Sequence, residues 1–126
     1  MSLPPGPMRV IHDFHSTKQE VLADIAKLDL WPTVYVSERM DELPQHWHDV
    51  DNCGYVMEGE SYVIDENGQH IPLRAGDKLE IPAGAVHAEG KVTERMVYIV
   101  GISKAENLFD ALNLLPPDTS PLKSST

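Results

Sequence analysis

The sequence lacks several features that would place it in other classes of protein. It has a single cysteine, Cys53, so it forms no intramolecular disulfide, which fits a reducing cytoplasm. No apolar run approaches the ~18 residues of a membrane-spanning helix. The first residues also lack the apolar stretch of a secretory signal. We therefore expect a cytoplasmic protein with no membrane partner.

Basic residues are scarce in this chain. Ten lysines and arginines stand against 20 aspartates and glutamates, which gives a net charge of −10. Such a surface repels phosphate backbones, so we expect no nucleic-acid partner. The acidic residues are spread along the chain, and we interpret their charge as a source of solubility.

The chain is long enough for one domain with one core, since it has 126 residues of which 41% are hydrophobic. Thr17 and Glu20 predict a capping box at the start of a helix, and Pro116-Pro117 would end a second helix. The predicted organisation is an N-terminal lead-in (1–15), a helix (16–31), a barrel (32–103), a second helix (104–115) and a flexible tail (116–126).

Between the two predicted helices the pattern is that of short strands. Alternating runs rich in β-branched and aromatic residues recur: TVYVSERM, HWHDV, GYVME, ESYVID, HIPLR, KLEI, VHAEG and RMVYIVGI. Turn signals separate them, among them Asn67-Gly68, which is typical of a hairpin. About seven or eight short strands at this spacing predict an antiparallel sandwich or barrel.

Three histidines form a candidate metal site. His46 and His48 stand one residue apart in a strand-like run, so we expect their imidazoles on one face. His87 follows IPAGAV at the start of another strand. Three neutral imidazoles are a good donor set for Fe(II), Ni(II), Zn(II) or Cu(II). The remaining histidines are expected to be solvated or packed: His12, His15 and His70.

The spacing around these histidines resembles the two motifs of the cupin superfamily, in its small single-domain form. The first motif, G-x5-H-x-H-x(3,4)-E-x6-G, corresponds here to Met40, His46, His48, Asn52 and Gly59. The second, G-x5-P-x-G-x2-H-x3-N, corresponds to Gly76, Pro82, Gly84, His87 and Lys91. The sequence departs from the family at Met40, Asn52 and Lys91, and the resemblance covers about Met40 to Lys91.

The resemblance implies an all-β fold: a double-stranded β-helix (jelly-roll) cupin barrel, which our helix predictions flank with one short N-terminal and one short C-terminal helix. It also implies a homodimer and one divalent transition metal ion (Fe, Ni, Mn or Zn) held by His46, His48 and His87. The fourth ligand stays open, because Asn52 stands where the family has glutamate. The amide of Asn52, the carboxylate of Asp51 after a shift in register, or water could occupy that position.

Strand alternation divides the residues that follow this position. If Asn52 faces the metal, Gly54 and Val56 share its face, while Cys53 and Tyr55 point away. We therefore predict that Cys53 is a buried packing residue rather than a ligand or a reactive thiol.

Three neutral histidines would leave the full +2 charge on the ion, which favours an anionic or chelating ligand. We therefore expect a metal-dependent enzyme acting on a small organic molecule, with dioxygenase-type chemistry favoured over lyase or isomerase chemistry. Tyr62, Arg95 and Tyr98 are candidate substrate-binding residues. The alternative is a non-catalytic cupin that binds or senses a small molecule.

Overall fold

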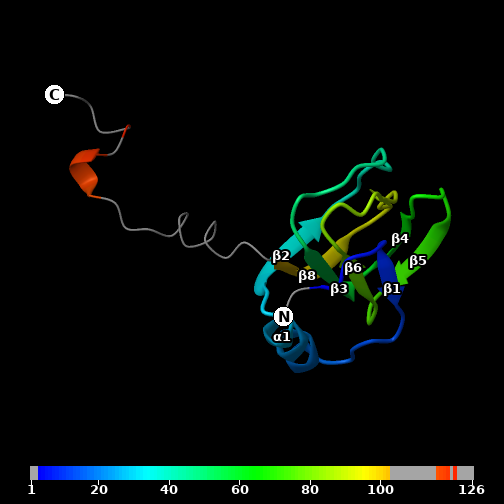
Figure 1. Cartoon of the computed structure of the whole chain (residues 1–126), viewed down its shortest axis with the longest axis horizontal. Helices are drawn as coiled ribbons and strands as arrows, with labels where there is room; N and C mark the ends of the chain where they lie inside the picture. The colour runs from blue at the N-terminus through cyan, green and yellow to red at the C-terminus, as the bar shows by residue number, and fades with distance from the viewer. Residues whose placement is uncertain (1–2, 103–115, 120, 122–126) are drawn as a thin grey trace.

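Two antiparallel β-sheets form the body of the protein (Figure 1). The computed structural model describes residues 3–102, 116–119 and 121. One sheet has the order β1 (Arg9–Ile11), β6 (Lys78–Ile81), β3 (Asn52–Glu58), β8 (Met96–Ile102) and β2 (Trp31–Ser37). The other has the order β5 (His70–Arg74), β4 (Glu60–Ile64) and β7 (Ala88–Glu89). The predicted all-β jelly roll is confirmed.

A further segment lies along the three-stranded sheet without forming a regular strand. Met40 forms an isolated antiparallel bridge with Val92, and His46 forms one with His87. Between them the N–H of Leu43 donates to the carbonyl of Glu89 at 3.0 Å. The segment from Met40 to His46 therefore lies beside β7, and this brings the two halves of the histidine motif together.

The main hydrophobic core lies between the two sheets and draws on both of them. Its buried members include Met8, Val56, Val63, Leu73, Leu79, Ile81, Ala85, Val92 and Met96. Strand β3 divides this core from a second one on the outer face of its sheet. Val56 faces inward, whereas Cys53 and Tyr55 pack against helix α1, so the predicted alternation along this strand is confirmed. Burial raises the pKa of the Cys53 thiol to about 12, as expected for an inert packing residue.

Helix α1 (Lys18–Lys27) lies inside the predicted range 16–31. Thr17 caps it, and the predicted capping box with Glu20 is present. The helix ends early because Asp29 adopts a left-handed backbone with φ of 59°, and Trp31 already belongs to β2. Val21 and Ile25 are buried at 0% and 1% exposure, and these two residues anchor the helix to the sheet.

A buried ion network holds α1 against β6. The ammonium group of Lys78 lies 2.6 Å from Asp24 of the helix and 2.8 Å from Glu80. The hydroxyl of Tyr55 donates to the same Asp24 carboxylate at 2.5 Å. Burial acts to lower the pKa of Lys78, but its two carboxylate partners outweigh this and raise it. Lys78 therefore stays charged, and the loss of Lys78 would leave the Asp24 carboxylate without its cationic partner.

Glycine is needed where the chain turns sharply between β3 and β4. Gly59 has a φ of 96°, and a Cβ built there would lie 2.2 Å from the carbonyl oxygen of Arg95. A residue with a side chain would be strained by this backbone angle and would also collide with the Arg95 carbonyl. The Asn67-Gly68 hairpin also forms, with Gly68 at a φ of 81° and its N–H donating to Asp65.

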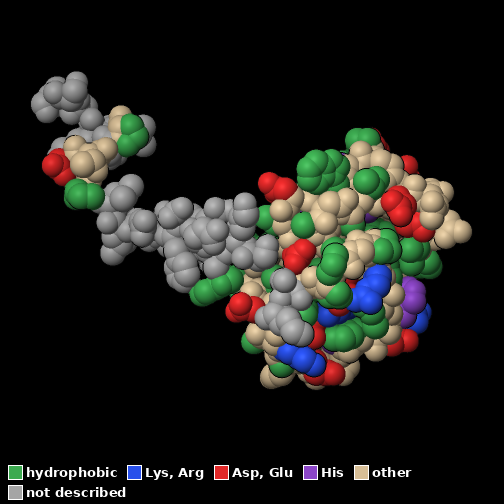
Figure 2. All heavy atoms as spheres, viewed as in Figure 1, with side chains coloured by type: hydrophobic (Ala, Val, Ile, Leu, Met, Phe, Trp, Pro, Cys, Tyr) green, Lys and Arg blue, Asp and Glu red, His purple; other side chains and the backbone are tan. Residues whose placement is uncertain are grey.

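The predicted second helix (104–115) lies outside the described residues. Within the predicted tail, Pro117–Thr119 forms a short 3-10 turn, η1. No helix in the described ranges is long and apolar enough to cross a bilayer. Acidic side chains are scattered over the face shown in Figure 2 rather than gathered in one patch, in keeping with the charge pattern of the sequence.

Asp77 ties the N-terminal lead-in to the turn before β6. Its fully buried carboxylate accepts hydrogen bonds from the Asp13 N–H, the His12 ring and the Arg74 N–H, each at 3.0 Å. Burial acts to raise the pKa of Asp77, but these donors outweigh it and lower the pKa. A carboxylate lowered in this way stabilises the fold above its unfolded pKa of about 3.9, and this contribution is lost as the pH falls through the folded-state pKa.

We predict that Asp77→Asn lowers the free energy of unfolding by about 1–3 kcal/mol at pH 7, because the amide lacks the charge and one acceptor. The difference from wild type should narrow as the pH falls below ~4 and through the lowered folded-state pKa of Asp77, because protonation removes the wild-type charge. Urea unfolding at pH 7 and at lower pH measures both effects. Asp41→Asn, at an exposed position, is the matched control and should change the free energy of unfolding at neither pH. An equal loss of stability in both variants would contradict the role assigned to Asp77.

Candidate metal centre

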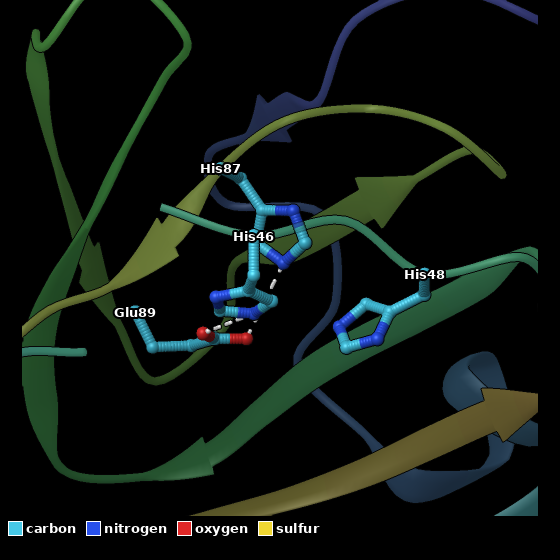
Figure 3. A group of neighbouring side chains, drawn as sticks. All are labelled: His46, His48, His87 and Glu89. Atoms are coloured by element: carbon cyan, nitrogen blue, oxygen red, sulfur yellow. Dashed lines mark ion pairs between the residues drawn. The ribbon is translucent and has the colours of Figure 1, made fainter. Parts of the chain in front are cut away.

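Four side chains converge at one end of the barrel: His46, His48, His87 and Glu89 (Figure 3). Each offers one nitrogen or oxygen atom, and these atoms lie within 4.8 Å of one another. The ring centroids of the three histidines are 4.5 to 5.2 Å apart. In the view of Figure 3, His48 approaches from the side opposite Glu89.

The backbone fixes this arrangement through a reciprocal bridge. The N–H of His46 donates to the carbonyl of His87 at 2.8 Å, and the N–H of His87 donates back at 2.9 Å. The carbonyl of His48 accepts from the N–H of Gly84 at 2.8 Å. Glu89 follows His87 by two residues on the same edge, so its side chain projects to the same side. Each half of the cluster is therefore a pair of residues spaced two apart.

His46 and His48 project together as predicted, although the predicted reason, a regular strand, is absent. The HWHDV run forms no regular strand; His46 makes an isolated bridge and His48 follows in a loop. The rings nevertheless lie 5.0 Å apart. Trp47, between them, points away and is 61% exposed.

Backbone carbonyls fix the tautomers of two of these histidines. Nδ1 of His46 lies 2.7 Å from the carbonyl oxygen of Pro44, and Nδ1 of His87 lies 2.9 Å from that of Ala85. A carbonyl only accepts, so each Nδ1 carries the proton and donates it. In the neutral rings Nε2 then holds a lone pair aimed into the cluster. Metal-binding histidines in proteins show this same arrangement.

The facing groups need a cation between them. His46 Nε2 lies 3.0 Å from one oxygen of Glu89, and His87 Nε2 lies 3.4 Å from the other (dashed lines, Figure 3). Nε2 of His87 is buried and has no hydrogen-bond partner of normal geometry within the described chain. Lone pairs that face a carboxylate repel it unless a proton or a metal ion lies between them. The donor set and its orphaned nitrogen thus fit a bound ion.

The size of the cluster also fits an ion. Bonds of about 2.0–2.2 Å place ligands on opposite sides of a metal at about 4.2 Å. The donor atoms here lie within 4.8 Å of one another, so small side-chain rotations would bring them into range. The nitrogen donors of His46 and His48 come from a segment that solvent can reach, whereas His87 is fully buried.

Electrostatics favour positive charge at this point. Burial acts to raise the pKa of Glu89, but its contact with the His87 ring and the proximity of the His46 ring outweigh it and lower the pKa. Burial likewise acts to lower the pKa of His87, and its contact with Glu89 overcomes this and raises it. For His48, burial and the neighbouring His87 and His46 lower the pKa. A carboxylate that stays ionised among imidazoles is a typical cation ligand.

Asp51, one of the two predicted candidates for the fourth ligand, is not among the clustered groups. Asn52, the other candidate, lines the cavity to which Glu89 also belongs. The carboxylate of Asp51 accepts a hydrogen bond from the N–H of Ala83 at 2.8 Å, which stabilises the turn before His87. Glu89 instead supplies the carboxylate oxygen of the cluster. The motif comparison did not assign it, although the spacing His87-x-Glu89 mirrors His46-x-His48 and was the available signal.

A cavity of about 410 Å³ adjoins the cluster. Residues of both sheets line it, and Glu89 belongs to the cavity and to the cluster alike. Of the predicted substrate-binding residues, Tyr62 and Tyr98 line this cavity. Arg95 lies in a separate hollow with Gly59, Glu60, Thr93 and Glu94.

Comparison with known proteins identifies a family. A model of the Cupin domain family matches residues 35–101 of the chain. A solved DUF861-family protein of Thermotoga maritima has a TM-score of 0.53 and 18% identity, over 75% of this chain and 98% of its own. No curated protein matches the chain.

Two further solved structures share the fold. One is a DUF861-family protein of unknown function from Pseudomonas syringae pv. tomato, with a TM-score of 0.51 and 20% identity, over 56% of this chain and 29% of its own. The other is a candidate mannose-6-phosphate isomerase from Ralstonia eutropha JMP134, with a TM-score of 0.52 and 20% identity, over 59% of this chain and 73% of its own. At these identities the likeness concerns the fold alone.

The isosteric variant Glu89→Gln tests which residue provides the oxygen ligand. We predict that it weakens Zn²⁺ binding by at least about tenfold, because it removes the negative charge of the cluster, whereas Asn52→Ala changes the affinity little. Isothermal titration of the metal-free proteins with Zn²⁺ measures both. A larger loss in Asn52→Ala than in Glu89→Gln would return the fourth position to residue 52.

Proposed function

The chain belongs to the Cupin domain family, and we propose that it binds one divalent transition metal ion through His46, His48, His87 and Glu89. We further propose that it is an enzyme acting on a small organic molecule that coordinates this ion. The observation that carries the proposal is the pair of Nε2 lone pairs, fixed by Nδ1 hydrogen bonds, that face an ionised carboxylate.

Glu89 changes the charge that the sequence led us to expect. Three neutral histidines alone would leave +2 on the ion, whereas the Glu89 carboxylate reduces the net charge of the centre to about +1. The ion keeps some preference for an anionic or chelating oxygen group. The absence of a carboxylate at position 52 therefore does not mean that metal affinity has been lost, since Glu89 on strand β7 of the other sheet offers one.

Each protein group has a separate task in this proposal. The carbonyls of Pro44 and Ala85 hold the rings of His46 and His87 in the metal-binding tautomer. Glu89 contributes negative charge and borders the cavity. His48 is exposed and comes from a loop, which leaves this side of the centre accessible to solvent.

Dioxygenase-type chemistry is the reaction we favour. A bound ion supplies Lewis acidity, and a redox-active ion such as iron also supplies O₂ activation. Four protein donors would leave two positions of a six-coordinate ion, enough for one bidentate molecule or for two single donors. The fully buried His87 and the apolar cavity wall keep bulk water from the inner side of the centre. Lyase and isomerase chemistry would use the same donors.

Metal analysis tests the proposal directly. We predict about one Fe, Ni, Mn or Zn ion per chain by mass spectrometry of the purified protein, and loss of most of it in His48→Ala, because that variant removes an exposed ligand without opening the core. His70→Ala is the matched control, since His70 lies on β5 outside the cluster, and should retain the metal.

Absence of metal after soaking with each of the four ions would refute the metalloenzyme proposal. The alternative expected from the sequence, a cupin that binds a small molecule without catalysis, would then be the remaining interpretation. A stoichiometric ion without oxygen consumption, in the presence of chelating probe compounds, would refute the oxygenase chemistry alone.

We also propose a homodimer that forms through strand β2. This strand ends the five-stranded sheet, and its sequence WPTVYVS carries no charge in a chain of net charge −10. Val34, Tyr35 and Val36 are 70%, 52% and 41% exposed. An uncharged edge is where two like-charged copies approach each other with least repulsion, and such edges readily pair.

Light scattering after size exclusion should give about twice the 14.0 kDa chain mass. We predict that Val36→Lys yields a monomer, because a lysine on an edge strand opposes pairing. Leu22→Lys is the matched control, since Leu22 is 42% exposed on α1, and should remain dimeric. A monomeric wild type at all concentrations would rule this interface out.

A further inference from the structure

We propose that the molecule bound at this centre has an uncharged, largely apolar body with one chelating oxygen group, and that this body fills the cavity between the two sheets. The inference rests on the proposed metal-binding function, because the chelating group requires the ion. The inference specifies the chemical class of the ligand and excludes sugars and phosphate esters from that class.

Charge is nearly absent from the cavity wall. Glu89 is the one charged side chain that lines it, and no lysine or arginine does so within the described part of the chain. A phosphate or carboxylate in the body of a ligand would lose its hydration there without a cation to replace it. Arg95, which the sequence suggested for this task, lies in the separate hollow with Glu60 and Glu94. Any anionic group of the ligand is therefore confined to the metal.

The wall also offers few free hydrogen-bond donors. Four lining hydroxyls already donate to protein acceptors: Thr33 to Val100 O at 3.1 Å, Ser37 to Glu38 O at 3.2 Å, Ser61 to Lys91 O at 2.8 Å and Tyr62 to Glu42 Oε1 at 2.7 Å. A sugar carries a hydroxyl on nearly every carbon and would leave most of them unpaired in this cavity, which disfavours its binding. An apolar body has no such requirement.

Besides the carboxylate of Glu89, three polar side chains of the wall remain available. Asn52, Tyr98 and the more exposed Tyr35 make no side-chain hydrogen bond within residues 3–102. Burial and then the nearby charge of Glu89 raise the pKa of Tyr98 to about 12, so its hydroxyl keeps its proton and can donate. Because Tyr98 and Glu89 line the same cavity, this hydroxyl can donate to an oxygen of a ligand that reaches from the cavity to the metal. We assign Tyr98 as a positioning residue for the chelating group.

Gly54 provides the space for a flat ring. Its backbone does not adopt the left-handed conformation that requires glycine, so the missing side chain matters for space. A Cβ built there would lie 3.5 Å from the Tyr98 ring and 3.8 Å from Leu79. The Tyr98 ring itself stacks with Tyr35 at 6.1 Å between centroids and 29° between planes. A planar apolar body can pack against such a ring, and a larger residue at 54 would displace it.

The full chain loaded with Zn²⁺ provides the test. It is titrated with 4-nitrocatechol, a flat ring with two chelating oxygens whose absorbance changes on chelation, and separately by calorimetry with mannose 6-phosphate. We expect saturable binding of 4-nitrocatechol, and binding of mannose 6-phosphate at least about tenfold weaker. Metal-free protein should bind 4-nitrocatechol more weakly than the Zn²⁺ form.

Three variants locate the binding. Gly54→Val should weaken 4-nitrocatechol binding by at least about tenfold with unchanged Zn²⁺ stoichiometry, because it fills the cavity without touching the cluster. Ala26→Val adds similar bulk on the exposed side of α1 and should bind as wild type does. Tyr98→Phe should weaken binding roughly fivefold, the effect of one lost hydrogen bond.

The outcomes separate the two proposals. Failure of the wild type to hold Zn²⁺ would refute the metal site and this inference with it. Zn²⁺ binding without 4-nitrocatechol binding, or with equally tight binding of mannose 6-phosphate, would refute the ligand class alone. Unchanged affinity of Gly54→Val for 4-nitrocatechol would place the ligand outside the cavity and overturn the inference. If Gly54→Val misfolds and loses Zn²⁺, then unchanged affinity of Tyr98→Phe for 4-nitrocatechol would overturn the inference instead.

Discussion

The reciprocal pair of backbone hydrogen bonds between His46 and His87 is the constraint on which the candidate site depends. It joins the segment after β2 to the segment before β7, which belong to different parts of the chain. With this register fixed, His48 follows on one side and Glu89 on the other. A shift of one residue would turn one pair of ligands away from the centre. The chemistry of the site is thus set by two main-chain contacts.

Strand β3 separates two environments of opposite character. On its inner face Asn52 and Gly54 border the apolar cavity. On its outer face Cys53 and Tyr55 pack against α1, next to the ion network of Lys78, Asp24 and Glu80. Buried charge is therefore concentrated where it holds the helix. The cavity wall, by contrast, has Glu89 as its charged group in the described chain.

Much of this arrangement could be predicted from the sequence because it follows from local rules. The capping box of Thr17 and Glu20, the alternation along β3 and the spacing of the two histidine motifs each depend on near neighbours in the chain. The role of Glu89 depends instead on how two segments meet. The sequence motif specifies one position, here Asn52, for the carboxylate ligand. A folded metal site requires only that some carboxylate lie close to the histidines, and Glu89 does so. Arg95 shows the opposite case, since its residue type suits an anionic ligand but it lines a separate hollow.

The extent of the helix and of the HWHDV run was harder to predict for a related reason. Asp29 ends α1 by taking a left-handed backbone, which its residue type permits but does not require. His46 and His48 keep their common direction although they lack a regular strand, because the partner segment at His87 and the turn at Gly84 hold them. In both places tertiary contacts decide what local preference leaves open.

The pairing of His-x-His with His-x-Glu has a consequence for the chain as a whole. An ion held by both pairs would act as a cross-link between residues 48 and 87, and would close the loop that contains β3 to β6. Closing a loop of this length restricts the unfolded chain far more than the folded one. Binding energy at the centre would then be folding energy for this end of the barrel. The proportion of folded molecules would follow the concentration of available metal in the cell.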